Sequence, residues 1–160
     1  MKSETNSADV ASIDAIINAS YDVISGPKGQ KRDWDRERSL FISGARLIPT
    51  AAVAGVADAD LSPLVLDVDA YIARVEPLFA RDGFYEKEVA RRTEQFGQIA
   101  HVWSTYESRH HQDDPEPFMR GINSIQLFND GTRWWIVSIY WQHESAQHPL
   151  PENYLRSATR

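Results

Sequence analysis

Residues 120–143, RGINSIQLFNDGTRWWIVSIYWQH, form two runs rich in β-branched and aromatic residues, separated by Asp130-Gly131. An Asp-Gly pair between such runs is typical of a hairpin with a two-residue type I′ turn. Two further runs of the same kind, over 85–95 and 98–109, come before this hairpin and meet at Phe96-Gly97. The second half of the chain therefore predicts a four-stranded meander.

The first half of the chain shows helical spacing instead. Apolar residues that recur every three or four positions predict a first helix over 9–24, ended by the breaker SGPKG at 25–29. Asp33 is suited to cap a short second helix over 34–40, with Glu37 and Arg38 directed to solvent.

A third helix is expected after short extended segments. Residues 45–53 and 64–66 read as strands joined by a loop over 55–62, and Asp67 or Asp69 caps the helix that follows. Pro77 is expected to kink or shorten that helix, because proline lacks the backbone N–H that a helix interior uses. Three helices followed by a meander predict an α+β domain and not a doubly wound sheet.

Length and composition limit the possible functions. A chain of 160 residues is expected to form one domain, here 9–148, with a disordered tail over 1–8 and a C-terminal tail over 149–160. It has no cysteine, which excludes disulfides and thiol chemistry, and its net charge of -6 argues against nucleic-acid binding. No apolar window of about 18 residues is present, so no membrane span is expected. We expect a cytoplasmic protein, while a signal peptide removed before residue 1 stays an open alternative.

The two turns set the pairing of the strands. A turn at Asp130-Gly131 places Leu127 opposite Trp134, and a turn at Phe96-Gly97 places Arg91 opposite Val102. A three-residue bulged loop in the second hairpin would shift its register and invert its faces, because successive side chains alternate across a strand.

With the two-residue turns, one face of the sheet is apolar near the turns and carries hydroxyl and amide groups further away. This is the usual character of a ligand pocket. The candidate pocket-lining residues, on this face and on the helices above it, are Tyr21, Trp34, Tyr71, Arg91, Ser104, Tyr106, Asn123, Trp134, Ser138 and Tyr140.

The opposite face is too apolar for the surface of a monomer, so it is expected to bury a second copy of the chain. The candidate dimer-interface residues are Trp103, Trp135, Val137, Ile139 and Trp141. On the same face lie Glu86, Glu88 and Glu107, which are expected to pair with arginines in solvent and not to act as catalysts.

Three local strings, in this order and spacing, resemble the nuclear transport factor 2-like superfamily, also called SnoaL-like. The strings are Asp33-Trp34-Asp35 before Gly44-Ala45-Arg46-Leu47, then FGQIAHVW at 96–103, then LFNDGTRWWIV at 127–137. The resemblance covers roughly residues 9–143. It implies a strongly curved mixed sheet wrapped as a cone around three helices, with an internal pocket, and frequent homodimers formed through the outer sheet face.

The resemblance leaves the function open, because this superfamily holds enzymes of several kinds as well as binding proteins. The first hypothesis is a domain that binds a small, largely apolar molecule. The alternatives are a cofactor-free enzyme of the cyclase, dehydratase or hydrolase type in the same pocket, and a dimeric interaction module whose cavity is filled. A titratable group with a displaced pKa beside free space would favour an enzyme.

Two candidate residues bear on the chemistry. Ketosteroid-isomerase-like members place an oxyanion-donating tyrosine on the first helix, where this chain has Tyr21, although a core tyrosine is the simpler interpretation. Those isomerases also use a carboxylate near the end of the first strand, but Leu47-Ile48-Pro49-Thr50 contains no acid. Arg91 is expected to pair with a helix acid such as Glu76, or else to contact an anionic or carbonyl ligand.

The remaining charged segment is an acidic loop with two histidines. His110-His111 precedes Asp113, Asp114 and Glu116, yet the spacing matches no standard metal site and prolines interrupt it. A solvated loop is therefore expected, with no metal and no cofactor.

Overall fold

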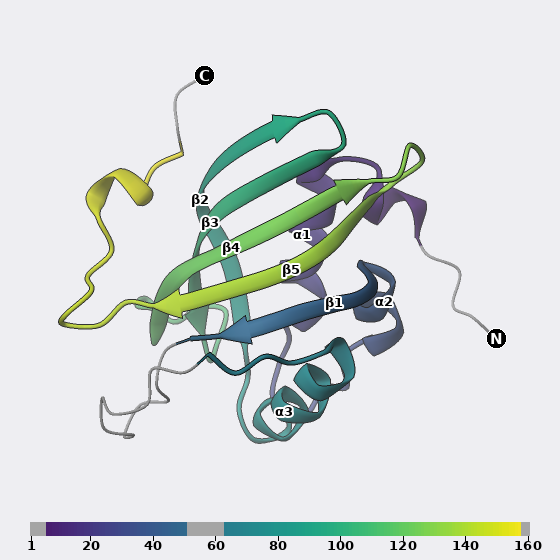
Figure 1. Cartoon of the computed structure of the whole chain (residues 1–160). Helices are drawn as coiled ribbons and strands as arrows, with labels where there is room; N and C mark the ends of the chain where they lie inside the picture. Colours follow the sequence, from purple (N-terminus) through teal and green to yellow (C-terminus); the bar gives the residue numbers. More distant parts are fainter. Residues whose placement is uncertain (1–5, 51–62, 158–160) are drawn as a thin grey trace.

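The computed structural model describes residues 6–50 and 63–157 of the 160-residue chain. Five strands form one curved sheet in the order β1-β5-β4-β3-β2, with the helices gathered against one face (Figure 1). The strands are β1 (Phe41–Pro49), β2 (Tyr85–Phe96), β3 (Ile99–Arg109), β4 (Met119–Asn129) and β5 (Trp134–His143). β1 runs parallel to β5 and the other neighbours are antiparallel. The predicted α+β fold with a curved mixed sheet is confirmed.

The main helices begin at the residues that cap them. α1 (Ile13–Ile24), α2 (Trp34–Ser39) and α3 (Val68–Arg81) start after Ser12, Asp33 and Asp67, whose side chains each accept a hydrogen bond from a backbone N–H of the first turn. Such caps satisfy amides that have no partner within the helix. Two short 3₁₀ helices complete the set, η1 (Ser7–Val10) and η2 (Glu152–Tyr154). No described helix has the length and apolar character needed to cross a membrane.

Two expected boundaries differ from the structure. α3 continues through Pro77 to Arg81, because Pro77 and Ala73 lie on the exposed side, where water can satisfy the carbonyl left without a partner. β1 begins at Phe41 and not at residue 45, since the carbonyl of Leu40 already accepts the N–H of Ile136 at 2.9 Å. The expected loop over 55–62 and the strand residues 51–53 lie outside the described residues.

One end of the inner sheet face is packed solid. Val102, Leu127 and Ile136, from β3, β4 and β5, are fully buried, as are Ile16 and Ile17 of α1 in the same core cluster. Each buried aliphatic side chain of this kind stabilises the fold by roughly 1.5–3 kcal/mol relative to exposure. We call this region the packed end.

The first hairpin carries a bulge that the alternating pattern does not reveal. Its turn is Gly97-Gln98, so Arg91 pairs with Ser104, two positions from the expected register and on the expected face. The register then shifts between Glu88 and Ala90. Because a one-residue bulge inverts every side chain beyond it, Glu86 and Glu88 point to the inner face and not outward as predicted.

The second hairpin has a four-residue loop over 130–133 in place of the expected two-residue turn. The carboxylate of Asp130 accepts hydrogen bonds from the backbone N–H groups of Thr132 and Arg133 and from the indole of Trp135, which holds this loop. Leu127 therefore pairs with Ile136 and not with Trp134. A longer loop of this kind shifts the register by two positions and leaves the faces unchanged near the turn.

A second bulge, at Val137, inverts the faces in the rest of β5. The register shifts between Gln126 and Leu127, opposite this residue. The expected positions are reversed as a result: Ser138 and Tyr140 point outward, with Tyr140 51% exposed, whereas Ile139 and Trp141 line the inside. Ser138 and Tyr140 are therefore not pocket residues, and Ile139 and Trp141 are not on the outer face.

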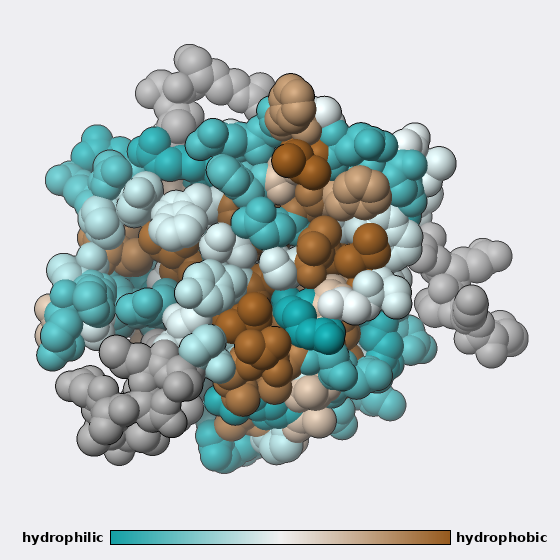
Figure 2. Space-filling view, in the orientation of Figure 1, coloured by the Kyte–Doolittle hydropathy of each residue, from teal (hydrophilic) through white to brown (hydrophobic). Residues whose placement is uncertain are grey.

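The outer face is partly covered by residues near the C-terminus. The backbone carbonyl of Tyr154 accepts the hydroxyl of Thr105 at 2.6 Å, and the tyrosine ring lies 5.9 Å from the ring of Trp103. Arg92 donates to the carbonyl of Asn153 at 2.9 Å. Figure 2 shows hydrophobic residues exposed among polar ones over the middle of this face.

Candidate functional site

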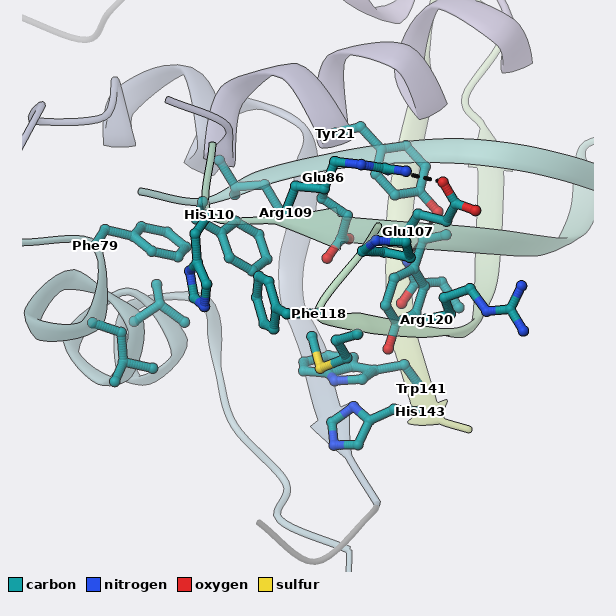
Figure 3. Close-up of a pocket in the computed structure, with 18 of the residues that line it drawn as sticks. Tyr21, Phe79, Glu86, Glu107, Arg109, His110, Phe118, Arg120, Trp141 and His143 are labelled. Atoms are coloured by element: carbon teal, nitrogen blue, oxygen red, sulfur yellow. Dashed lines mark hydrogen bonds and ion pairs between the residues drawn. The ribbon is translucent and has the colours of Figure 1, made fainter. Parts of the chain in front are cut away.

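A cavity of about 1130 Å³ lies between the helices and the inner sheet face, at the end opposite the packed end. Leu47, Phe79, Phe84, Ile139 and Trp141 supply much of its apolar wall. Figure 3 shows Tyr21 from α1 and Glu86 from β2 reaching toward the same space, with Trp141 and His143 on the opposite side in this view. The volume is of the order that small-molecule sites occupy, ~300–1,000 Å³.

Glu86 is one of the carboxyl groups that line this cavity. The bulge in β2 turns it inward, where its Oε2 accepts the hydroxyl of Ser108 at 2.9 Å. Burial raises the pKa of Glu86 to about 7, against the smaller opposing effect of hydrogen bonds from Ser108 and Asn123. No cationic side chain among the described residues forms an ion pair with it. Near neutral pH the group is therefore present in both its protonated and its ionised form.

A hydrogen-bonded chain lies next to Glu86, and its direction can be assigned. The hydroxyl of Ser104 donates to the carboxylate of Glu88, so its single proton is committed. Tyr21 must then donate its own proton to Ser104 Oγ at 2.7 Å, and it accepts from Asn123 Nδ2 at 3.0 Å. The Tyr21 hydroxyl is thus satisfied as both donor and acceptor. Tyr21 is a positioning group in this arrangement and has no proton left for a ligand.

Arg91 connects this hydrogen-bonded chain to the protein surface. This guanidinium contacts Glu88, with Nη2 2.8 Å from Oε1, and also pairs with Asp14 at the start of α1. The expected pairing of Arg91 with a helix acid thus occurs with Asp14 and not with Glu76, and Arg91 is absent from the cavity wall. Because the ion pair with Arg91 anchors Glu88 and Asn123 holds the other end, Ser104 and Tyr21 are held in one geometry.

A second carboxyl group, Glu37 on α2, also lines the cavity. It is 3% exposed, contrary to its expected place in solvent, because it lies one turn after the buried Trp34 and shares its helix face. Its Oε2 has no hydrogen-bond partner in the described part of the chain. Burial raises the pKa of Glu37 to about 8, partly offset by Arg36.

Tyr106 contributes a second unpartnered polar group. It is 1% exposed, and its hydroxyl has no hydrogen-bond partner among residues 6–50 and 63–157. The hydroxyl lies over Gly121, where a Cβ atom would stand 2.5 Å from it and 2.4 Å from the carbonyl of Gln142. Glycine is required at this position for Tyr106 to keep its place.

Ion pairs surround the mouth of the cavity. Arg109 Nη1 lies 2.9 Å from Glu107 Oε2, and Arg120 Nε lies 2.6 Å from Glu144 Oε1. At the edge near α3, Arg81 pairs with Asp82 at 3.1 Å. These charges neutralise each other and leave the interior acids without a counter-ion.

The residues predicted for the pocket and for the outer face lie in three different regions of the structure. Four of them line the cavity: Tyr21, Tyr71, Tyr106 and Asn123. Behind the wall lie Trp34, which stacks on Phe79 with ring centroids 6.2 Å apart, the core residue Trp134, and Ser104 in the hydrogen-bonded chain. On the outer face, Trp103 and Val137 are exposed. The guanidinium carbon of Arg133 lies over the Trp135 ring, 3.4 Å from its centroid.

Sequence reasoning missed Glu37 and Glu86, two lining acids that form no ion pair in the described part of the chain. Glu37 was detectable from its spacing of three residues after Trp34 on a short helix. Glu86 carried no such signal, because nothing in the sequence marks Val89 as the extra residue of a bulge.

The histidine loop between β3 and β4 folds on itself. His110 stacks on Phe118 with ring centroids 3.8 Å apart and contacts the carbonyl of Gly83 at 3.0 Å through Nδ1. Asp114 accepts the backbone N–H of His111 at 3.0 Å. Within the described ranges no three His, Asp or Glu side chains come together as a metal site.

Comparison with known proteins identifies the fold. No family model matches the sequence, and no curated protein matches it. Solved structures do match. A nuclear transport factor 2-like protein of unknown function from Silicibacter pomeroyi is 18% identical, with a TM-score of 0.56 over 84% of this chain and 94% of that one.

Two further structures agree with this fold. A protein from Kribbella flavida is 14% identical, with a TM-score of 0.60 over 86% of this chain and 93% of that one. A candidate ketosteroid isomerase from Parabacteroides distasonis is 10% identical, with a TM-score of 0.55 over 91% of this chain and 98% of that one. The chain has the nuclear transport factor 2-like fold, as the sequence resemblance predicts.

Proposed function

We propose that this protein is a cofactor-independent enzyme that transfers a proton on a small, largely apolar molecule bound in the cavity, with Glu86 as the acid–base group. The observation that carries the proposal is the position of Glu86: an inward carboxyl without a counter-ion, in the wall of a large and mainly apolar cavity. An apolar wall binds an apolar substrate, and a general acid or base must stand within reach of it.

The environment of Glu86 suits it to both halves of a proton transfer. Its pKa of about 7 leaves the ionised form available as a base and the protonated form available as an acid. Ser108 donates to the carboxyl at 2.9 Å, and the neighbouring Asn123 is itself held by Tyr21 at 3.0 Å. A fixed carboxyl group needs little reorganisation during the reaction.

The alternatives are weaker on specific grounds. Binding alone does not require a carboxyl group that is present in both protonation states near neutral pH, as Glu86 is. A cavity of about 1130 Å³ favours a bound molecule over an interior filled by side chains. The fold shared with a candidate ketosteroid isomerase does not transfer that activity, since Leu47-Ile48-Pro49-Thr50 supplies no acid on β1.

The proposal can be tested with 5-nitrobenzisoxazole, a flat apolar molecule that reports on a base in an apolar site. A base removes the proton on its carbon, the N–O bond breaks, and the bond electrons leave on oxygen as a coloured cyano-nitrophenolate. We expect the native protein to catalyse this reaction with a rate that rises with pH around a midpoint of about 7. Glu86→Gln should lower the rate by about 100-fold.

A matched control removes an acid that lies elsewhere. Glu76 is exposed on α3 and does not line the cavity, so Glu76→Gln should retain the native rate and pH profile. The proposal is wrong if Glu86→Gln and the native protein react at the same rate, or if the native rate shows no dependence on pH between about 5 and 9.

A further inference from the structure

The interior of the cavity carries the carboxyl groups of Glu37 and Glu86, and no arginine of its described lining pairs with either. Four arginines belong to its lining: Arg81, Arg109 and Arg120 pair with the carboxylates of Asp82, Glu107 and Glu144, and Arg74 is exposed on α3. None of them pairs with Glu37 or Glu86 in the described part of the structure. A bound molecule therefore meets carboxyl groups in the interior, while the arginines of the described lining are paired or exposed to solvent.

Glu37 is the more deeply buried of the two acids and the one without a partner. The guanidinium of Arg36, the residue before it in α2, is already held by Asp9 at 2.8 Å and by Asp22 at 2.6 Å. Glu37 Oε2 has no hydrogen bond within the described ranges, although the side chain is 3% exposed. A buried polar group without a partner destabilises the folded state. A bound molecule that supplies a donor or a positive charge removes this cost.

Aromatic rings stand around this end of the cavity. The charge of Glu37 contributes to the raised pKa of Tyr71, after the larger effect of burial. The Tyr71 ring packs edge to face against the ring of Trp141, with centroids 6.1 Å apart. Phe79 lines the same region and stacks on Phe84 at 4.9 Å. Aromatic faces attract organic cations through their negative quadrupole, so they add to the attraction of a carboxylate.

We propose that the molecule bound in this cavity carries a basic nitrogen on an apolar body, and that Glu37 pairs with it as an ammonium group. The inference rests on the proposed function, because it names the class of substrate on which Glu86 acts. When the ammonium group enters, Glu37 gives its proton to solvent and the two charges pair, so the charge of the site is balanced. An anionic ligand meets two acids instead, and a neutral ligand gains no ion pair.

Three straight-chain molecules of equal length separate these cases. Isothermal titration calorimetry of the native protein with octylamine, octanol and octanoate should give the tightest binding for the amine. We expect the dissociation constant of octylamine to be about tenfold or more below that of octanol, with octanoate the weakest. Glu37→Gln should bring octylamine to the level of octanol while octanol binding stays unchanged, which also shows that the variant is folded. Glu76→Gln should keep the native order.

The outcomes separate this inference from the proposed function. Equal binding of octylamine and octanol, or a preference for the amine that survives in Glu37→Gln, overturns the inference. A preference lost in Glu86→Gln but kept in Glu37→Gln overturns the assignment to Glu37. Absence of binding by all three molecules also overturns it. In each case the assay with 5-nitrobenzisoxazole and Glu86→Gln decides separately whether the cavity supports proton transfer.

Discussion

The inner face of the sheet has two ends that differ in kind. At the packed end, Val102, Leu127 and Ile136 fill the space beneath the first helix with aliphatic side chains. At the cavity end, the same strands present Tyr106 and Asn123, and the neighbouring strand adds Glu86. One face of one sheet therefore provides both the stability of the fold and the place for its chemistry.

The change from one end to the other occurs at the bulges. β3 and β4 keep a regular register along their whole length, whereas β2 shifts beside Val89 and β5 shifts beside Val137. Without the shift in β2, Glu86 would face outward, and without the shift in β5, Trp141 would do the same. Bulges next to functional sites commonly redirect a side chain in this way.

The first prediction concerns packing at the two ends. Leu127→Ala leaves a hole in a filled core and should lower the free energy of unfolding by about 2–5 kcal/mol. Ile139→Ala only enlarges a space that already exists, so its effect should be clearly smaller. Urea unfolding of both variants measures the difference. Equal losses would mean that the cavity end is packed as tightly as the other.

The second prediction concerns the burial of Glu37 and its dependence on pH. The pKa of Glu37 in the folded protein, about 8, lies above the ordinary value of 4.5. The folded state therefore binds the Glu37 proton more tightly than the unfolded state, and low pH favours folding. The contribution of the protonated Glu37 to the free energy of unfolding is fully present below the unfolded pKa, and it is lost as the pH rises toward about 8. Glu37→Gln should therefore raise the free energy of unfolding at about pH 8 by roughly 2–3 kcal/mol. A variant no more stable than the native protein at that pH would show that Glu37 is not buried.

The third prediction concerns the hydrogen-bonded chain behind the cavity wall. Ser104→Ala removes the acceptor of the Tyr21 proton and the donor to Glu88, so two buried groups lose a partner. The free energy of unfolding should fall by about 1–2 kcal/mol, with the fold retained. Thr132→Ala, in the exposed loop between β4 and β5, is a control for the loss of a surface hydroxyl bond. An equal effect of both substitutions would contradict the role of Ser104.

The fourth prediction concerns the outer face, which we propose to be a homodimer interface. Trp103 and Val137 are exposed there, 39% and 38%, and both substitutions Trp103→Glu and Val137→Glu place charge in the apolar area. Sedimentation should show a smaller species for these variants and little change in unfolding of the separated protomer, because the side chains add little to the protomer core. A native protein that already sediments as a monomer contradicts the proposal.

Much of the fold follows from the sequence, because it depends on periodic patterns. Apolar spacing and the candidate caps Asp33 and Asp67 or Asp69 predict the helices, of which Asp33 and Asp67 act as caps, and the runs and turns predict the meander. The site was less accessible. Tyr106 and Asn123 lie on β3 and β4, which pair without a bulge, so alternation is enough to place them, and helical spacing places Tyr21. Glu86, Ser138 and Trp141 lie beyond a bulge, and one extra residue reverses a prediction that is otherwise correct.

The central claim is that Glu86 is a cavity acid that holds its proton up to neutral pH. Carbon-13 NMR of protein labelled at the glutamate carboxyl carbons, titrated between about pH 3 and 9, reads this directly, with the signal assigned by its loss in Glu86→Gln. The account predicts that this signal titrates with a pKa of about 7. A Glu86 pKa near the ordinary 4.5 would mean that the carboxyl stands in water, and would contradict the account.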